Sequence, residues 1–161
     1  MKAIFAGTFD PPTLGHWDVL QGALPLFEKL YIVIANNTTK KPLLKVDERV
    51  KIFQELIHEA GFASRCEVMV APGLVIDLCE KLDVQYLVRG VRSSSDLERE
   101  LPMSVANQLL SSKVKTILFP STKEHSFVSS TLVREIAALD GDISKFVPKL
   151  VQQFIAKGKK S

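Results

Sequence analysis

The stretch "AGTFDPPTLGHWD", residues Ala6 to Asp18, lies between a hydrophobic run of strand length and a helical pattern. Gly7 lets the backbone turn tightly, and the prolines at positions 11 and 12 stiffen the loop. His16 stands at the start of the helix, where free N–H groups and the positive dipole end attract anions, and Thr8 adds a hydroxyl nearby. A capped turn with a surface histidine is the simpler interpretation. The glycines, prolines and polar side chains gathered here favour a phosphate site.

Hydrophobic runs recur along the chain with helical patterns between them, at residues 2–6, 30–35, 66–71, 84–89 and 115–120. Most of these runs are apolar on both faces, which is typical of parallel strands covered by helices on both sides. Their alternation with helices predicts an α/β fold: a Rossmann-like open five-stranded parallel sheet with helices on both faces and a helical C-terminus. In such sheets ligands bind beyond the carboxyl ends of the strands, where the strand order reverses.

The helical patterns carry two further expectations. Residues 93–112 read as one long helix that Pro102 should kink or split. After the last strand the chain is helical, through 129–139 and 147–158. His58 falls on the exposed side of an amphipathic helix and is assigned no role.

Composition limits the class of protein. The 161 residues suit a single domain, 1–161, and 46% hydrophobic with 24% charged residues argue against disorder. The net charge of +3 is too small to indicate a nucleic-acid partner, although it suits substrates that carry phosphates. No apolar run approaches the roughly 20 residues that span a membrane. Cys66 and Cys79 lie far apart, so neither a disulfide framework nor a structural metal site is expected. A soluble, cytoplasmic protein is predicted.

Two arginine-containing segments follow strand ends. In "RGVR", Arg89 to Arg92, the guanidinium forks suit phosphate oxygens and Gly90 allows close backbone approach. Two solvated arginines at a strand exit are an equal alternative for this tetrapeptide alone. Its place at the same sheet edge as the first turn favours a function.

The segment "HSFVSSTLVR", His125 to Arg134, places three hydroxyl residues and an arginine at a helix start. Serine and threonine are ordinary N-caps, but three in succession exceed what a cap requires. The segment is interpreted as a second anion cradle, of a size for a polyphosphate. Lys40 and Lys41 lie in a polar loop and are either solvated or bring positive charge to the same site. Glu100 either serves a ligand or pairs with Arg99 or another neighbour.

Taken together, these motifs resemble a known family. "TLGH" matches the (H/T)xGH signature of the nucleotidyltransferase superfamily, and "SSTLVR" resembles its SSTxxR motif. With "GTFDP", "KKP", "RGxR", "DxExE" and "PSxxxxFVSST", the chain resembles the bacterial phosphopantetheine adenylyltransferases from about Lys2 to Phe154. The resemblance implies reversible transfer of AMP from ATP to 4′-phosphopantetheine, which gives dephospho-coenzyme A and pyrophosphate, with Mg²⁺ as cofactor.

The resemblance also implies roles for individual residues. His16 would bind the ATP phosphates and stabilise the transferring α-phosphoryl group, with Thr8, Lys40 and Arg92 completing the catalytic set. The acceptor substrate would contact Thr8, Phe9, Lys40, Val75, Arg89 and Asn107. ATP would contact Thr8, Phe9, His16, Gly90, Val91, Arg92, Glu100, His125, Ser126, Phe127, Val128, Ser129, Ser130 and Thr131. Arg134 falls at the basic position of the SSTxxR motif.

The family further implies a homohexamer built as a dimer of trimers, and coenzyme A as a possible feedback ligand. No carboxylate stands out as a Mg²⁺ ligand, so no metal-binding residue is predicted and ATP phosphates with water would hold the ion. The chain has Leu14, Arg99 and His125 where the family commonly has Asn, Tyr and an aromatic Trp or Tyr.

Two other functions compete with this one. The first is another adenylyl- or cytidylyltransferase, which acts on nicotinate mononucleotide or glycerol 3-phosphate. The Lys40 loop and the placement of "RGVR" favour phosphopantetheine over these substrates. The second is a catalytically silent module that senses ATP or coenzyme A, which would have no need of His16. A scaffold role has no positive support in the sequence.

Overall fold

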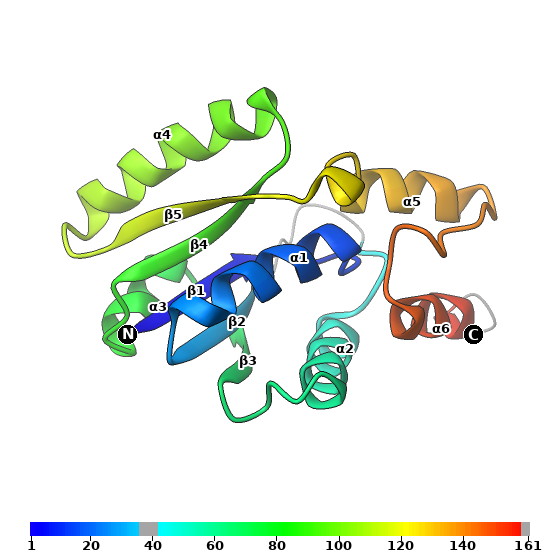
Figure 1. Cartoon of the computed structure of the whole chain (residues 1–161), viewed down its shortest axis with the longest axis horizontal. Helices are drawn as coiled ribbons and strands as arrows, with labels where there is room; N and C mark the ends of the chain where they lie inside the picture. The colour runs from blue at the N-terminus through cyan, green and yellow to red at the C-terminus, as the bar shows by residue number, and fades with distance from the viewer. Residues whose placement is uncertain (36–41, 159–161) are drawn as a thin grey trace.

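A parallel sheet in the strand order β3-β2-β1-β4-β5 forms the centre of the computed structural model, which describes residues 1–35 and 42–158 (Figure 1). The strands are β1 (Lys2–Gly7), β2 (Lys29–Ala35), β3 (Cys66–Ala71), β4 (Tyr86–Val91) and β5 (Lys115–Pro120). The helices are α1 (Leu14–Ala23), α2 (Val46–Glu59), α3 (Val75–Lys81), α4 (Ser94–Leu110), α5 (Ser130–Ala138) and α6 (Lys149–Gly158), with short 3-10 turns η1 (Leu24–Leu26) and η2 (Lys123–His125). The predicted fold class is confirmed.

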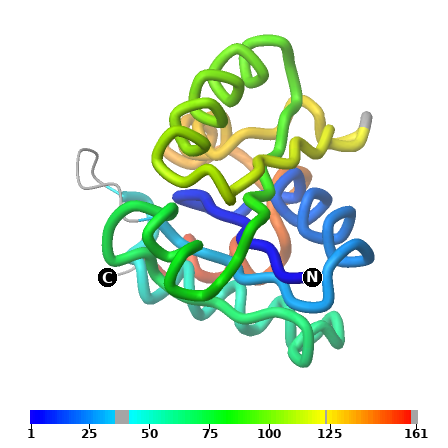
Figure 2. Tube along the Cα trace, turned by 90° about the vertical axis from the view of Figure 1, so that its left-hand side faces the viewer, coloured from blue at the N-terminus to red at the C-terminus, as the bar shows by residue number. Residues whose placement is uncertain are grey.

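Alternate residues of the central strands pack against helices on opposite faces of the sheet. In β1, Phe5 joins a buried cluster with α1 and α2, whereas Ile4 joins a second cluster with α3. Figure 2 shows α1 and α3 on opposite sides of the strands. A third cluster unites α2, α5 and α6 beyond the carboxyl ends of the strands. These apolar contacts hold the helices in place around the sheet. They thereby fix the positions of the carboxyl ends of the strands, where the site residues lie.

The strand order reverses between β1 and β4, which are hydrogen-bonded neighbours although far apart in sequence. Phe5 of β1 pairs with Ile32 of β2 on one side and with Val88 of β4 on the other. The turn after β1 and the segment after β4 therefore leave the sheet side by side. This is the place where open parallel sheets bind ligands.

The strand expected at 84–89 instead covers Tyr86–Val91. Asp83 adopts the left-handed backbone conformation (φ 52°), and the N–H of Val84 donates to the Cys79 carbonyl at 2.8 Å. Val84 thus closes the end of α3 and is buried there, so its hydrophobicity reflects helix–sheet packing. The other predicted strands agree with the structure to within one residue at either end.

Helix α4 continues through Pro102 as one helix, so of the two expected effects, a kink or a split, the split is wrong. Pro102 and Glu98, the residue whose carbonyl loses its helical partner, are both exposed to solvent. Water can therefore satisfy that carbonyl, which lowers the cost of a proline inside the helix.

Two other expectations concern single side chains. Cys66 and Cys79 are buried free thiols, and His58 is exposed on α2.

Across residues 1–35 and 42–158, no helix is long and apolar enough to cross a membrane.

Candidate active site

A cavity of about 470 Å³ opens at the carboxyl ends of β1 and β4, between α1, α4 and the start of α5. Eleven of the residues predicted from sequence line it: Thr8, Phe9, His16, Arg89, Gly90, Arg92, Glu100, Val128, Ser129, Ser130 and Thr131. Val75, Val91, Asn107, His125, Ser126 and Phe127 are outside this lining. Lys40 falls outside the residues that the structure describes.

The floor of the cavity is the turn after β1, where Phe9 reverses the direction of the chain. Phe9 has a positive φ of 49°, and its ring is buried against Phe5 and Phe53 at centroid distances of 5.0 and 4.9 Å. A Cβ on Gly7 would lie 2.9 Å from this ring, so glycine is required there. The turn sends Phe9 into the core and leaves the neighbouring Thr8 exposed at the cavity.

His16 is fixed by a reciprocal cap at the start of α1. The Thr13 backbone N–H donates to His16 Nδ1 at 3.0 Å, and the His16 N–H donates to Thr13 Oγ1 at 3.3 Å. Since Nδ1 accepts a hydrogen bond, the proton of the neutral ring is on Nε2. Phe9 packs edge-on against the ring at 5.0 Å. The imidazole therefore presents an Nε2–H donor to the cavity.

The charge state of His16 follows from its surroundings. Burial, followed by the positive charges of Arg92 and Arg89, lowers the pKa of His16 from 6.5 to about 3. The ring is consequently neutral at physiological pH. It stabilises an anion as a hydrogen-bond donor, without a charge of its own.

Arg89 leaves β4 on one side of the cavity and is held by Glu100 of α4. Its Nε and Nη2 donate to the two oxygens of Glu100 at 2.8 and 2.7 Å, while Nη1 donates to the Ala6 carbonyl at 2.5 Å. This two-point pairing fixes the plane of the guanidinium. Glu100 thus orients an arginine, and of the two alternatives from sequence the structure shows the paired one, with Arg89 and not Arg99 as the partner.

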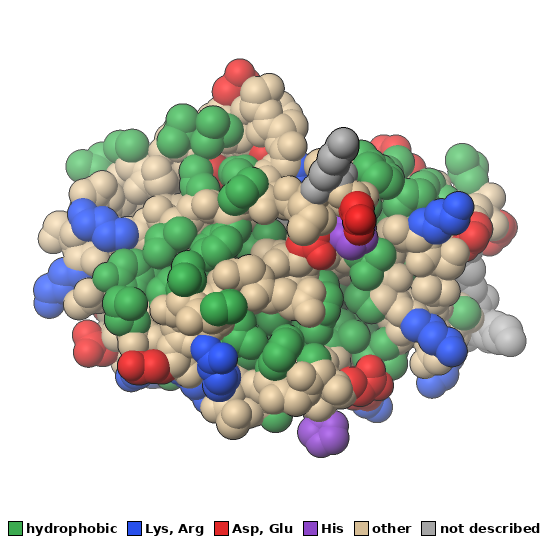
Figure 3. All heavy atoms as spheres, viewed as in Figure 1, with side chains coloured by type: hydrophobic (Ala, Val, Ile, Leu, Met, Phe, Trp, Pro, Cys, Tyr) green, Lys and Arg blue, Asp and Glu red, His purple; other side chains and the backbone are tan. Residues whose placement is uncertain are grey.

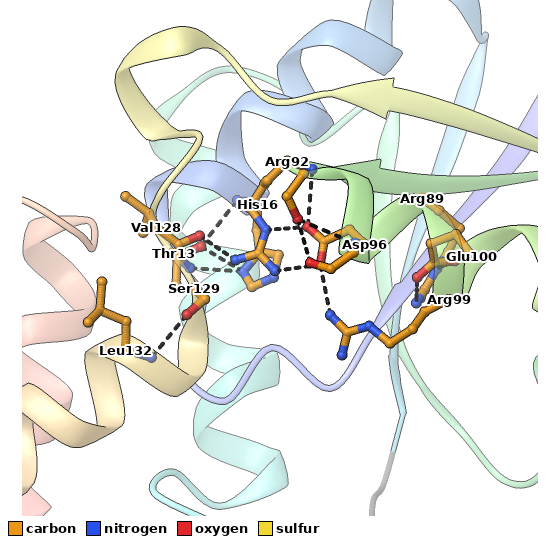
Figure 4. Close-up of polar contacts among 12 residues, drawn as sticks. Thr13, His16, Arg89, Arg92, Asp96, Arg99, Glu100, Val128, Ser129 and Leu132 are labelled. Carbon is orange, nitrogen blue, oxygen red and sulfur yellow. Dashed lines mark hydrogen bonds and ion pairs between the residues drawn. The ribbon is translucent and has the colours of Figure 1, made fainter.

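Arg92 occupies the other side, next to His16 (Figure 4). Its Nε donates to Asp96 at 2.9 Å, and Nη1 donates to the Val128 carbonyl at 2.8 Å. Asp96 also accepts from Arg99 Nη2 at 2.8 Å. Burial alone would raise the pKa of Asp96, but the hydrogen bonds and charge of Arg92, together with the hydrogen bond from Arg99, lower it below its usual value. The carboxylate stays ionised and ties β4, α4 and the segment before α5 together.

The start of α5 completes the wall. Ser129 caps the helix by accepting the Leu132 N–H at 3.0 Å, and the Ser130 hydroxyl donates to the Pro11 carbonyl at 2.8 Å. The Ser130 hydroxyl therefore donates within the protein, whereas the Ser129 hydroxyl is engaged here as an acceptor. The first backbone N–H groups of α5 remain at the cavity, as the positive end of the helix dipole.

The remaining predicted residues lie near this wall or on other elements. His125 Nδ1 is 2.7 Å from Asp18 Oδ2 of α1, next to Thr122, whose hydroxyl also contacts Asp18. Phe127 is exposed and packs edge-on against Phe146. Val91 ends β4, and Ser126 follows η2.

The two residues predicted to line the substrate arm, Val75 and Asn107, lie on α3 and α4. Val75 packs against the cluster under α3, and the Asn107 carbonyl accepts the Ser111 N–H. Their assignment to the substrate stays a prediction.

Asp10 explains the place of Arg134. The buried Asp10 carboxylate accepts the N–H groups of Leu43 and Leu44 at 2.9 and 2.8 Å, and Arg134 Nη1 lies 3.7 Å from it. Arg134 is outside the cavity lining. Its position indicates that it joins α5 to the turn after β1 and stabilises the wall of the cavity.

Sequence reasoning assigned no role to Thr13, Asp18 or Asp96, which hold the donors in place. A weak signal for Thr13 existed, because a threonine three residues before a polar side chain at a helix start is the spacing of a capping box. Asp96 stands three residues before Arg99, a spacing at which side chains meet on a helix, whereas Arg92 precedes α4. Asp18 meets His125 only through the tertiary fold.

Known proteins resemble this chain in sequence and in fold. The cytidylyltransferase-like family model matches residues 4–136. The chain is 39% identical over 155 residues to the phosphopantetheine adenylyltransferase of Coxiella burnetii (strain Dugway 5J108-111), covering 96% of this chain and 95% of that protein. It is 40% identical over 154 residues to the protein of the same name from Helicobacter pylori (strain J99 / ATCC 700824), covering 96% of both. Among solved structures, Plasmodium falciparum nicotinic acid mononucleotide adenylyltransferase complexed with NaAD matches with a TM-score of 0.73 at 19% identity, covering 98% of this chain and 95% of that one. This last likeness supports the fold.

Proposed function

The chain belongs to the cytidylyltransferase-like family and, within it, to the phosphopantetheine adenylyltransferases, and from that premise we propose how its cavity performs the reaction. The enzyme transfers AMP from ATP to 4′-phosphopantetheine, giving dephospho-coenzyme A and pyrophosphate. The observation that carries this proposal is the convergence of His16, Arg89 and Arg92 on one cavity at the switch point of the sheet.

The nucleophile in this reaction is a phosphate, which is ionised at neutral pH, so no strong general base is required. In the proposed mechanism, an oxygen of the phosphopantetheine phosphate attacks the α-phosphorus of ATP in line with the departing pyrophosphate. Catalysis then consists of holding two anions together and stabilising the charge on the phosphorus that is transferred. The cavity offers N–H donors on several sides, as this task requires.

His16 is proposed to donate from Nε2 to an α-phosphoryl oxygen. A neutral donor held by Thr13 meets the developing charge without needing a proton transfer of its own. Thr8, exposed beside it, is proposed to orient the acceptor phosphate with the Phe9 backbone.

The two arginines are proposed to serve different substrates. Arg89, fixed by Glu100, binds the phosphate of phosphopantetheine. Arg92 and the first N–H groups of α5 bind the polyphosphate of ATP, because both lie on the Val128–Ser129 side of the cavity. Lys40, which lies outside the described residues, remains the proposed neutralising charge for the acceptor phosphate.

Mg²⁺ is proposed to enter with ATP. Among the described residues, no three His, Cys, Asp or Glu side chains gather as a metal site. The cavity carboxylates, Asp96 and Glu100, are both paired with arginines and are poor metal ligands in that state. We therefore propose that phosphate oxygens and water hold the ion, as is usual for Mg²⁺.

A homo-oligomer, with the hexamer as its proposed size, is supported by helix α4. Leu97, Leu101, Val105 and Leu109 follow one another at four-residue spacing and are all exposed. In Figure 3, hydrophobic side chains collect on the half of the molecule where Figure 1 places α4, β4 and β5. Exposed apolar surface of this kind is typical of a subunit interface. Light scattering after size-exclusion chromatography measures the mass, and a monomer at micromolar concentration contradicts the proposal.

Coenzyme A is proposed as a feedback ligand because it carries the same pantetheine arm as the substrate and product. We expect it to raise the apparent KM for phosphopantetheine in initial-rate assays. The enzyme is proposed to act in the cytoplasm, where reduced thiols such as Cys66 and Cys79 persist.

The proposed function is tested by pyrophosphate release from ATP and Mg²⁺ with and without 4′-phosphopantetheine. Release that depends on phosphopantetheine, together with dephospho-coenzyme A detected by mass spectrometry, is expected. Release with nicotinate mononucleotide or glycerol 3-phosphate instead would identify another transferase. ATP binding without release would identify a sensor module.

A further inference from the structure

Arg99 lines the cavity, and the mechanism above does not use it. It extends from the first turns of α4 toward Asp96, and its guanidinium lies beside the carboxylate that holds Arg92 (Figure 4). Its side chain is 74% exposed, compared with 28% for Arg92. Within the described part of the chain, its one hydrogen bond is the contact from Nη2 to Asp96. The other N–H donors of the guanidinium are open to a ligand.

The charge of the cavity depends on this residue. Three arginines, Arg89, Arg92 and Arg99, line it together with two carboxylates, Asp96 and Glu100. His16 is neutral because its pKa is lowered to about 3. Without Arg99, the charges on the described lining would cancel. A cavity that binds two polyanionic substrates needs the positive excess that Arg99 supplies.

Asp96 places Arg99 on the nucleotide side of the cavity. Its two oxygens accept from the backbone N–H and side chain of Arg92 as well as from Arg99. Arg89 is held separately by Glu100. Arg99 is therefore coupled to the arginine that faces the start of α5, and its charge lies on the open side of that arginine.

A simple surface ion pair is the alternative explanation for the Arg99–Asp96 contact. The Arg99 side chain is 74% exposed, so solvent screens this pair, and the buried Asp96 carboxylate is already neutralised by Arg92. A second arginine on the same carboxylate thus adds little to the fold. It does add a positive charge at the mouth of the cavity.

We propose that Arg99 is a further substrate-binding residue, which contacts the polyphosphate of ATP at the open side of the cavity and accompanies pyrophosphate as it leaves. This inference rests on the proposed function for the identity of the nucleotide. Arg99 binds the polyphosphate of ATP and does not contact the phosphate of phosphopantetheine.

The experiment compares Arg99→Gln with Lys51→Gln, a control that removes one positive charge from an exposed ion pair on α2 outside the cavity. Dissociation constants for ATP and for inorganic pyrophosphate are measured by isothermal titration calorimetry, and KM values for both substrates by initial rates. We expect Arg99→Gln to weaken ATP and pyrophosphate about tenfold, as for loss of a charge-assisted contact. Arg99→Lys should recover part of the affinity, and the KM for phosphopantetheine should stay within about twofold.

Two results would overturn the inference. If Arg99→Gln binds ATP and pyrophosphate as tightly as Lys51→Gln does, Arg99 only forms an ion pair with Asp96 and does not bind the ligand. A change confined to phosphopantetheine would assign it to the acceptor. If the wild type forms no dephospho-coenzyme A, the proposed function fails, while the calorimetry still decides whether Arg99 binds the polyphosphate.

Discussion

The turn after β1 and the carboxyl end of β4, with Arg92 directly after it, present N–H donors to the same cavity in different ways. In the first, His16 is neutral, and the Thr13 backbone fixes its ring. In the second, Arg89 and Arg92 are charged, and Glu100 and Asp96 hold them. A neutral donor depends on its position alone, whereas the arginines depend on the balance of charge around them. The first turn should therefore determine the rate of the chemical step, and the second should determine how tightly the anions are held.

Removing the neutral donor tests this comparison most strongly. We expect His16→Ala to lower kcat by about 10²-fold or more, the effect of deleting one positioned donor to a transition state. Rapid-quench or steady-state pyrophosphate release measures it, with circular dichroism as the check on folding. A folded variant with unchanged kcat would remove His16 from the mechanism.

Disturbing one charged clamp should have a smaller effect that falls mainly on binding. In Glu100→Gln, the amide can accept only one of the two hydrogen bonds from Arg89, so the plane of the guanidinium is no longer fixed. We expect the KM for phosphopantetheine to rise about tenfold while kcat falls less. Initial rates at saturating ATP measure both constants.

Glu98→Gln is the matched control, because Glu98 is exposed on the same helix and outside the cavity lining. Equal effects of the two substitutions on the KM for phosphopantetheine would mean that this KM depends on the negative charge of α4. The two-point pairing of Glu100 with Arg89 would then have no special role. A loss in kcat as large as that of His16→Ala would contradict the division of labour between the two segments.

The neutrality of His16 predicts how stability depends on pH. Its folded pKa, about 3, is below its unfolded value of 6.5, so the unfolded chain binds more protons between these values. The free energy of unfolding should then decrease as the pH falls below 6.5. Urea unfolding at a series of pH values is the measurement, and His16→Gln, which cannot titrate, should show a shallower decrease. Parallel curves for the two proteins would mean that the imidazole is not held neutral.

The smallest effect is expected from the Thr13 hydroxyl. Thr13→Val removes the side-chain cap of α1 but keeps the backbone N–H that donates to His16 Nδ1. We expect a loss of about 1 kcal/mol in the free energy of unfolding and only a few-fold change in kcat. Thr13→Ser, which keeps the hydroxyl, is the control. A fall in kcat comparable to that of His16→Ala would show that the hydroxyl fixes the ring.

The fold and the place of the site could be predicted because both depend on local patterns. Runs that are apolar on both faces indicated parallel strands, and short motifs after strands 1 and 4 indicated the same sheet edge. The strand order then brought His16, Arg89 and Arg92 together as expected. Only the strand predicted to begin at Val84 was displaced, since burial against α3 and burial in a strand look alike in sequence.

The partners of the charged residues could not be predicted. Asp96, Glu98, Arg99 and Glu100 are near neighbours in one stretch, so several pairings satisfy helix spacing equally well. The structure selects Glu100 for Arg89 across the sheet edge and Asp96 for Arg92 and Arg99. The neutral state of His16 depends on burial and on two arginines distant in sequence, which no local motif encodes.

The contact between Phe9, Phe53 and the His16 ring links the reacting centre directly to the interior of the protein. For protein engineering, this means that activity and thermal robustness cannot be adjusted independently at this turn. A substitution that enlarges or shrinks Phe53 would shift Phe9 and, through it, the donor that faces the α-phosphate. Stabilising changes are better sought in α6 or on the exposed side of α2, where packing does not reach the imidazole.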